Sequence, residues 1–230
     1  MRRPDRPTVD TGRLVERLCF LLPPVIGVGV VGVLQETDPG VPLLGRGLFL
    51  LGTFGYVALS VILAAAIVLD AHSIRTANGW DPNPGLYGVA ALAVAPLAGV
   101  IYLARRHRAL GTAAGPSWWW TVVAFSLATT LIGFAAAAVG AILVIPELAV
   151  SGVAVAGAIA VGTFPIAIHQ DAAYLTERTG ANGRWRPNPG VYLGLAFLSL
   201  SLPPLQPVLA GYYLWRRRRA LAPTPRARTR

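Results

Sequence analysis

The sequence has no lysine, one cysteine and few charged side chains of any kind. Charged residues make up 13% of the 230 residues, against roughly a quarter in average soluble domains. The single cysteine, Cys19, excludes an intrachain disulfide framework and a cysteine-based zinc cluster. Because 54% of the residues are hydrophobic and the mean hydropathy is +0.57, the composition predicts a small integral membrane protein rather than a soluble globule.

Six apolar runs contain no aspartate, glutamate, arginine or histidine. The shortest has 17 residues and would reach about 26 Å as a helix, close to the ~30 Å hydrocarbon core of a bilayer. Lipid does not satisfy backbone polar groups, so each run is predicted to be one membrane-spanning helix. The runs cover residues 18–34, 47–69, 86–104, 118–145, 148–168 and 191–215.

The two halves of the chain share a sequence pattern. Residues 70–87 read DAHSIRTANGWDPNPGLY, and residues 171–192 read DAAYLTERTGANGRWRPNPGVY. The runs that follow end in IYLARRHRAL and YYLWRRRRAL. The predicted fold class is an all-α membrane protein with six transmembrane helices built from two three-helix repeats. The expected regions are a basic tail (1–17), the first repeat (18–104), a basic connecting loop (105–117), the second repeat (118–215) and a disordered arginine-rich tail (216–230).

A repeat with an odd number of crossings would place its two copies in opposite orientations, as in the inverted repeats of many transporters. With six crossings, both termini lie on the same side of the membrane, together with 13 of the 20 basic side chains. Both termini are therefore predicted to be on the cytoplasmic side of the cell membrane. The cluster at Arg105, Arg106 and Arg108 then lies on the opposite side, against the preference of positive charge for the cytoplasm. In the alternative, one segment does not cross the membrane.

The repeated Asn-Pro pairs are interpreted as helix caps, because asparagine is a favourable N-cap and proline suits the first helical position. The tryptophans just before them suit the headgroup zone as aromatic anchors. These cap and anchor residues are Trp80, Asn83 and Pro84 in the first half and Trp185, Asn188 and Pro189 in the second.

The tryptophan-proline-asparagine loop, the apolar helix and the ends YLARRHR (102–108) and YLWRRRR (213–219) resemble multi-pass membrane proteins of haloarchaea. This resemblance implies a membrane location and brings no catalytic residues. The paired Asn-Pro-Gly motifs also resemble the Asn-Pro-Ala motifs of aquaporins, which open a half-helix followed by a complete span. Only 19 apolar residues separate Gly85 from Arg105, which is enough for one helix, and Val191 stands where aquaporins carry arginine. An aquaporin assignment is therefore rejected.

The net charge of +10 is concentrated at the ends of the predicted spans, so it is interpreted as contact with anionic lipid headgroups rather than nucleic acid. The arginines assigned to headgroups are Arg105, Arg106, Arg108, Arg216, Arg217, Arg218 and Arg219. No catalytic residue, metal site or cofactor is predicted. A metal site or proton relay using Asp70 with His72 and Asp171 with His169 is an alternative, although residues two apart on a helix point in nearly opposite directions.

Gln206 lies within an apolar run, between Pro203 and Pro207. A broken helix with an amide near the bilayer midplane is a pointer to a small-molecule site, so these three residues are a candidate binding site. The first hypothesis is a non-enzymatic polytopic membrane protein with a structural or interaction role, which could form a homo-oligomer. The alternative is an uncoupled transporter or channel for a small neutral solute at the repeat interface.

Overall fold

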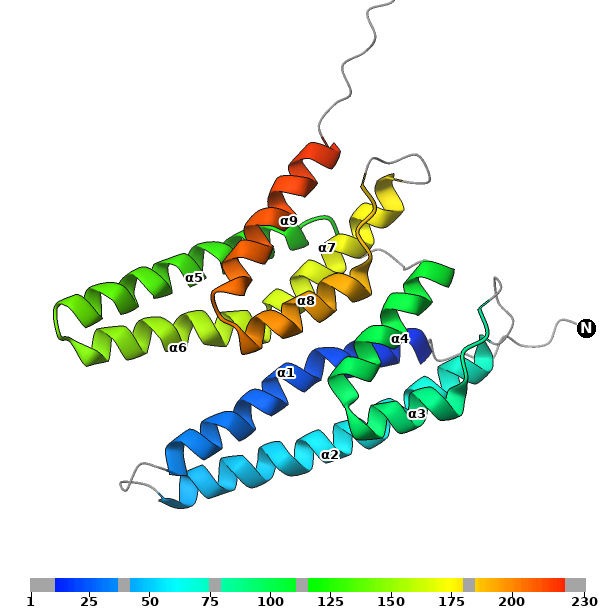
Figure 1. The fold of residues 1–230 in the computed structure, drawn as a ribbon, viewed down its shortest axis with the longest axis horizontal. Helices are drawn as coiled ribbons and strands as arrows, with labels where there is room; N and C mark the ends of the chain where they lie inside the picture. The colour runs from blue at the N-terminus through cyan, green and yellow to red at the C-terminus, as the bar shows by residue number, and fades with distance from the viewer. Residues whose placement is uncertain (1–10, 37–41, 75–79, 111–115, 180–184, 222–230) are drawn as a thin grey trace, which may run out of the picture. The chain divides into compact units, whose positions relative to one another are not determined.

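The computed structural model describes residues 11–36, 42–74, 80–110, 116–179 and 185–221 (Figure 1). All regular structure within these residues is helical. Three of the described helical segments are long and apolar enough to cross a membrane, namely Thr11–Val33, Leu43–Ser73 and Trp119–Ile142, and they are compatible with a membrane location. The chain divides into a first unit, Met1–Gly111, and a second unit, Thr112–Arg230.

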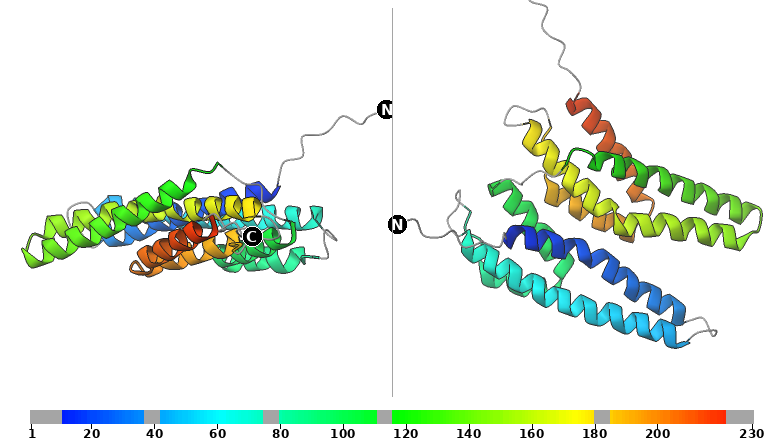
Figure 2. Two further views of the ribbon diagram at one scale, coloured as in Figure 1. Left: turned by 90° about the horizontal axis from the view of Figure 1, so that it is seen from above. Right: turned by 180° about the vertical axis from the view of Figure 1, so that it is seen from behind.

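The first unit begins with a long helical hairpin. Helices α1 (Thr11–Glu36) and α2 (Pro42–Ser73) pack side by side along most of their length (Figure 1 and Figure 2). Close packing depends on glycine, because a Cβ atom on Gly52 would lie 2.4 Å from the Cα of Gly29. Small residues at such contacts let two helix backbones approach closely, as in many membrane proteins.

The third apolar run is divided into two helices. Helix α3 (Pro84–Ala93) and helix α4 (Ala95–Leu110) are separated by Val94, whose φ of −143° and ψ of 73° are not helical. Pro96 explains the break, because its ring would clash with the carbonyl of the residue four positions earlier in a continuous helix. The prediction of one uninterrupted helix over 86–104 is therefore wrong.

Helices α3 and α4 form a hairpin rather than a straight rod. The rings of Tyr87, near the start of α3, and Tyr102, at the middle of α4, are 5.1 Å apart at their centroids. The Arg105 guanidinium, further along α4, donates a hydrogen bond to the Tyr87 hydroxyl at 3.0 Å. The chain therefore enters the hairpin and leaves it at the same end of the first unit.

The second unit also begins with two helices that pack against each other. Helix α5 (Trp119–Ile142) packs against α6 (Pro146–Gly162), which Thr163 separates from α7 (Phe164–Thr179). The predicted continuous helix over 148–168 is thus interrupted, and Pro165 in the first turn of α7 explains why. At the α5–α6 contact, a Cβ on Gly133 would lie 2.6 Å from the carbonyl oxygen of Gly152.

The sixth apolar run also folds back on itself. Helix α8 (Pro189–Ser201) and helix α9 (Leu205–Leu221) are separated by residues 202–204, which contain the Pro203-Pro204 pair. The centroids of the Tyr192 and Tyr213 rings lie 5.0 Å apart, so the start of α8 meets the middle of α9. The single helix predicted over 191–215 is likewise corrected to a helical hairpin.

Candidate functional site

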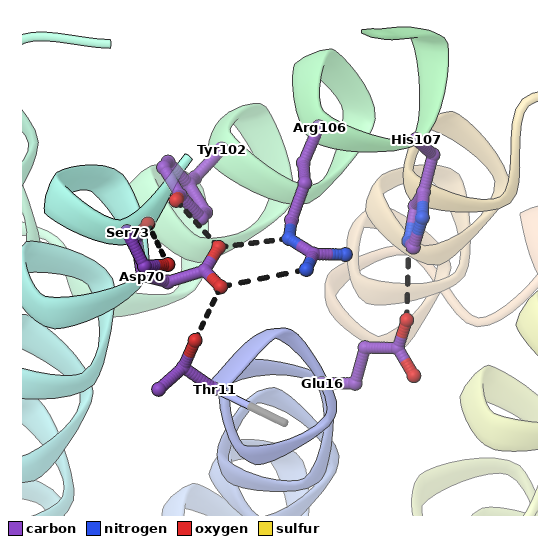
Figure 3. A network of polar contacts seen from close by, with 7 residues as sticks. All are labelled: Thr11, Glu16, Asp70, Ser73, Tyr102, Arg106 and His107. Atoms are coloured by element: carbon purple, nitrogen blue, oxygen red, sulfur yellow. Dashed lines mark hydrogen bonds and ion pairs between the residues drawn. The ribbon is translucent and has the colours of Figure 1, made fainter. Parts of the chain in front are cut away.

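A buried carboxylate connects three helices of the first unit (Figure 3). Asp70, near the end of α2, is 1% exposed. Its Oδ2 accepts hydrogen bonds from the Tyr102 hydroxyl at 2.7 Å and from Arg106 Nε at 2.8 Å, both on α4. Its Oδ1 accepts from the Thr11 hydroxyl on α1 at 2.6 Å and from Arg106 Nη2 at 3.4 Å. We call Asp70, Tyr102 and Arg106 the first polar centre.

The second unit contains a matching set of residues. Asp171 on α7 is 0% exposed, and its Oδ2 accepts from the Tyr213 hydroxyl and from Arg217 Nε, each at 2.8 Å. Its Oδ1 is buried and has no hydrogen-bond partner among the described residues. We call Asp171, Tyr213 and Arg217 the second polar centre. A buried carboxylate held by a charged donor and a hydroxyl fastens α9 onto α7 as α4 is fastened onto α2.

The predicted tryptophan anchors pack on the tyrosines of these centres. The centroids of Trp80 and Tyr102 are 5.6 Å apart, and those of Trp185 and Tyr213 are 5.5 Å apart. Tilted and edge-to-face pairs of this kind add roughly 0.5–1.5 kcal/mol beyond the burial of their area. The tryptophans therefore pack against the tyrosine of each polar centre.

The two Asn-Pro pairs cap the first helix of each hairpin. The Asn83 side chain accepts a hydrogen bond from the Leu86 amide at 3.1 Å, and the Asn188 side chain accepts from the Val191 amide at 3.2 Å. Pro84 and Pro189 occupy the first turn of α3 and α8. Such a cap contributes about 1 kcal/mol and sets the residue at which each helix starts.

The arginine clusters divide into two groups. Arg106 and Arg217 bind the buried aspartates, so they leave the set of headgroup-facing arginines predicted from the sequence. The other arginines at these helix ends include two pairs that line pockets beside the tryptophans. Trp80, Arg105, Arg108 and Ala109 line a pocket of about 400 Å³, and Trp185, Arg216, Arg219 and Ala220 line one of about 240 Å³.

The histidines do not join the aspartates in the way that a metal site requires. Asp70 is buried in the first polar centre, whereas His72 is exposed and its Nδ1 lies 2.8 Å from the Val68 carbonyl oxygen. His107 on α4 instead faces Glu16 on α1, with Nε2 and Oε1 3.5 Å apart (Figure 3). Each aspartate accepts hydrogen bonds from tyrosine and arginine, an arrangement suited to holding helices together.

Gln206 lies in a cavity of the second unit. It is 1% exposed at the start of α9, and its Nε2 donates to the Ser126 hydroxyl of α5 at 2.9 Å. The cavity has a volume of about 100 Å³, and its lining includes Thr130, Ser199, Pro203 and Gln206. Pro207 is partly buried beside it and is not among the lining residues.

The mostly apolar lining of this cavity includes two polar atoms without a hydrogen-bond partner among the described residues. Gln206 Oε1 and Thr130 Oγ1 are buried and have no hydrogen-bond partner within the part of the chain that the structure describes. A buried polar atom without a partner costs about 1–3 kcal/mol, so a small molecule that donates to the amide oxygen would recover that energy. The surrounding wall is otherwise mostly apolar, which suits a small neutral solute or ordered water.

Sequence reasoning missed several of these residues. Thr11, Ser126 and Thr130 lie far along the chain from the groups they accompany, and only folding brings them there. The link between tyrosine and arginine had a visible signal, however. Tyr102 and Arg106 are four residues apart, as are Tyr213 and Arg217, so each pair shares one face of its helix.

No protein-family model, curated protein or solved structure matches this chain.

Proposed function

We propose that this chain is a polytopic membrane protein with four crossing segments and two re-entrant hairpins, one in each unit. The crossing segments are α1, α2, α5 and the α6–α7 pair. The supporting observation is that each hairpin, α3–α4 and α8–α9, starts and ends at the same end of its own unit. At ~1.5 Å per residue, the 10-residue α3 and the 13-residue α8 reach about 15 and 20 Å, short of a full bilayer.

This topology removes the charge conflict of a six-span arrangement. With re-entrant hairpins, both arginine clusters fall on the same side as both termini. In chain order, 19 of the 20 arginines are then cytoplasmic, and Arg46 is the exception. The bias is far stronger than the 13 of 20 obtained with six spans, and it agrees with the rule that positive charge stays inside. The repeat is then parallel, because each unit crosses the membrane an even number of times.

The re-entrant arrangement is tested by cysteine labelling in intact cells. Cys19→Ser supplies the background, and single cysteines replace Asp81, Arg186, Leu43 or Val144, all of which are exposed. We expect a membrane-impermeant thiol reagent to label Leu43→Cys and Val144→Cys directly. Asp81→Cys and Arg186→Cys should react only after permeabilisation. Opposite accessibility of the two loop positions would refute the parallel arrangement and restore the inverted repeat.

For the role of the protein, we propose a non-enzymatic structural or interaction function. The proposal is supported by the polar centres, in which both aspartates bind arginine and tyrosine of a neighbouring helix. Both oxygens of Asp70 and the Oδ2 of Asp171 are engaged in this way. The contribution of each carboxylate is to hold a re-entrant hairpin in place, because a broken pair would leave a buried charge at a cost of about 3–5 kcal/mol.

A second candidate function is the passage of a small neutral solute through the second unit. It is favoured by the Gln206 cavity, where the Gln206 amide oxygen at the tip of the α8–α9 hairpin and the Thr130 hydroxyl of α5 are both buried. Backbone that leaves helical geometry at membrane depth is tolerated where it lines a cavity. The candidate site is therefore the α8–α9 break within one unit, rather than the repeat interface proposed from the sequence.

Flux measurements in proteoliposomes test this second function. Gln206→Leu removes both the amide oxygen and the bond to Ser126 while keeping a similar volume. Uptake of water, glycerol and urea is followed by light scattering, with Gln170→Leu, at a partly buried position on α7, as the amide-loss control. We expect Gln206→Leu alone to lower the flux to that of protein-free vesicles. A flux that Gln206→Leu leaves intact contradicts a pathway at this site.

A further inference from the structure

The pocket formed by Trp185, Arg216 and Arg219 has guanidinium groups that are positioned in advance. The Arg216 guanidinium lies 5.4 Å from the centroid of the Trp185 ring, and the Arg219 guanidinium lies 4.0 Å from that of Trp215. Stacking on an aromatic face restricts a long arginine side chain before any ligand arrives. The two arginines are three residues apart, so they lie on neighbouring parts of one helix face.

The two arginines that line this pocket are not the arginine that binds the buried Asp171. Arg217 lies between the two pocket arginines in sequence, but its Nε binds Asp171 at 2.8 Å. Arg216 and Arg219 instead line the 240 Å³ pocket together with Trp185 and Ala220. Arginine presents planar, forked donors that match the oxygens of a phosphate group, often with two parallel hydrogen bonds.

The first unit has the same construction. Trp80, Arg105 and Arg108 line a pocket of about 400 Å³, and Arg106 is held by Asp70. The hydrogen bond from Arg105 to the Tyr87 hydroxyl, 3.0 Å long, orients that guanidinium. The same residue types thus line equivalent pockets in both units, which points to a built site rather than a chance grouping of surface charge.

We propose that each of these pockets binds a phosphate group, and that its source is the headgroup of an anionic phospholipid. The inference rests on the membrane location proposed above and makes the headgroup contact specific to two arginines in each unit. Tryptophan and arginine at the end of a membrane helix lie at the depth of lipid phosphates. The lipid chains would then lie along the apolar helices, whose exposed side chains include Leu97 and Val208.

The two pockets differ next to the tryptophan. Asp81 follows Trp80 in the first unit, and Arg186 follows Trp185 in the second, and both side chains are exposed. A carboxylate near the first pocket reduces the positive potential there, whereas an additional guanidinium raises it near the second. The second pocket is therefore the tighter phosphate site.

The test uses the full chain, purified in detergent, and counts bound phosphatidylglycerol by native mass spectrometry. Arg219→Gln removes one charge from the lining of the second pocket, and Arg218→Gln removes one charge from a neighbouring exposed residue that does not line the pocket. We expect Arg219→Gln to weaken the tighter binding event by about tenfold, the loss of one charge-assisted hydrogen bond, and Arg218→Gln to have little effect. Equal weakening by the two variants would overturn the site in favour of general surface charge.

Further arms of the experiment separate the possible sources of phosphate. Phosphatidylcholine, with no net charge, should bind less tightly than phosphatidylglycerol, and inorganic phosphate at millimolar concentration should not displace the lipid. Displacement by inorganic phosphate would overturn the lipid assignment and indicate a free-phosphate site. Thermal unfolding of Arg219→Gln should match that of Arg218→Gln, which shows that the fold is retained. Cysteine labelling at positions 81 and 186 tests the proposed membrane topology independently. A failure of the topology can therefore be distinguished from a failure of the phosphate-binding proposal.

Discussion

In both units the two ends of the helical hairpin are fixed by the same kinds of residues, whereas the tips of the two hairpins differ. Each hairpin begins with an asparagine cap and ends on an aspartate–tyrosine–arginine centre. Between the capping asparagine and the first arginine, however, the second unit has six more residues than the first. Helix α8 is 13 residues long against 10 for α3, and three residues rather than one separate it from the following helix.

The extra length coincides with a change in chemistry. Ala95 and Gln206 occupy equivalent positions, because each precedes the proline in the first turn of α4 or α9. Ala95 is fully buried and has no polar side-chain group, whereas Gln206 places its amide in a cavity with Thr130. The comparison indicates that the polar centres are common to both units and that the units differ in chemistry at the tip of the second hairpin.

The polar centres differ in how completely the aspartate is satisfied, and this predicts unequal effects of the same substitution. Asp70→Asn replaces an oxygen that accepts from Thr11 and Arg106 with an amide that also donates. We expect it to destabilise the first unit by about 3–5 kcal/mol. Asp171→Asn also removes the charge that pairs with Arg217, but its amide can be placed where Oδ1 has no described partner, so a smaller loss of about 3 kcal/mol is expected.

Hydrogen exchange of the full chain in detergent, read by mass spectrometry, resolves the two units. Protection in α4 should fall more after Asp70→Asn than protection in α9 after Asp171→Asn. Equal losses would show that Thr11 adds nothing to the first centre. The control is Asn188→Asp, which retains a capping side chain at the start of α8.

Removing the tyrosine hydroxyls should destabilise the second unit more than the first, the reverse of the order expected for the aspartate substitutions. Tyr213→Phe leaves Asp171 with Arg217 alone among its described donors, whereas Tyr102→Phe leaves Asp70 with Arg106 and Thr11. We expect losses of about 1–2 kcal/mol in unfolding free energy, with the larger loss for Tyr213→Phe. Thermal unfolding in detergent measures both variants, and Tyr212→Phe, at an exposed position, is the control. A larger loss for Tyr102→Phe would contradict the assigned donor sets.

The smallest expected effect comes from Thr11, the donor at the first centre that comes from α1. Thr11→Val keeps the shape of the side chain and removes the hydroxyl that donates to Asp70 Oδ1 at 2.6 Å. Because Arg106 still reaches the same oxygen, we expect a loss of only about 0.5–1.5 kcal/mol. Reactivity of the buried Cys19 thiol during heating reports the unfolding of α1. An unchanged thiol reactivity profile would remove Thr11 from the first polar centre.

Much of the secondary structure could be predicted from apolar runs and caps, but the break in each third run could not be located. Pro96 and Pro207 are visible in the sequence, yet proline is tolerated inside helix α1 at Pro23 and Pro24. Whether a proline kinks a helix or reverses it depends on what the two flanking segments contact. Here the contacts are Tyr87 with Tyr102 and Tyr192 with Tyr213, which join residues 15 and 21 positions apart.

In the candidate sites too, some residues could be recognised from the sequence and others could not. Gln206 was recognisable as an isolated amide between prolines, but Ser126 and Thr130 are 80 and 76 positions away and carried no signal of their own. The arginines were recognisable as a group, whereas the separation of Arg106 and Arg217 from their neighbours requires the position of the buried aspartates. Long-range partners of this kind are set by helix packing.

By itself, the sequence determined the helical class, the apolar character, the two copies of one pattern and the first residue of each capped helix. These properties follow from composition and from interactions between residues within about four positions of each other. Tertiary structure alone decided that the third run of each unit turns back, that its arginines divide between aspartate and pocket, and that Gln206 faces a cavity. The physical reason is that a buried charge or amide takes its stable position from distant donors, which only the packed helices bring within reach.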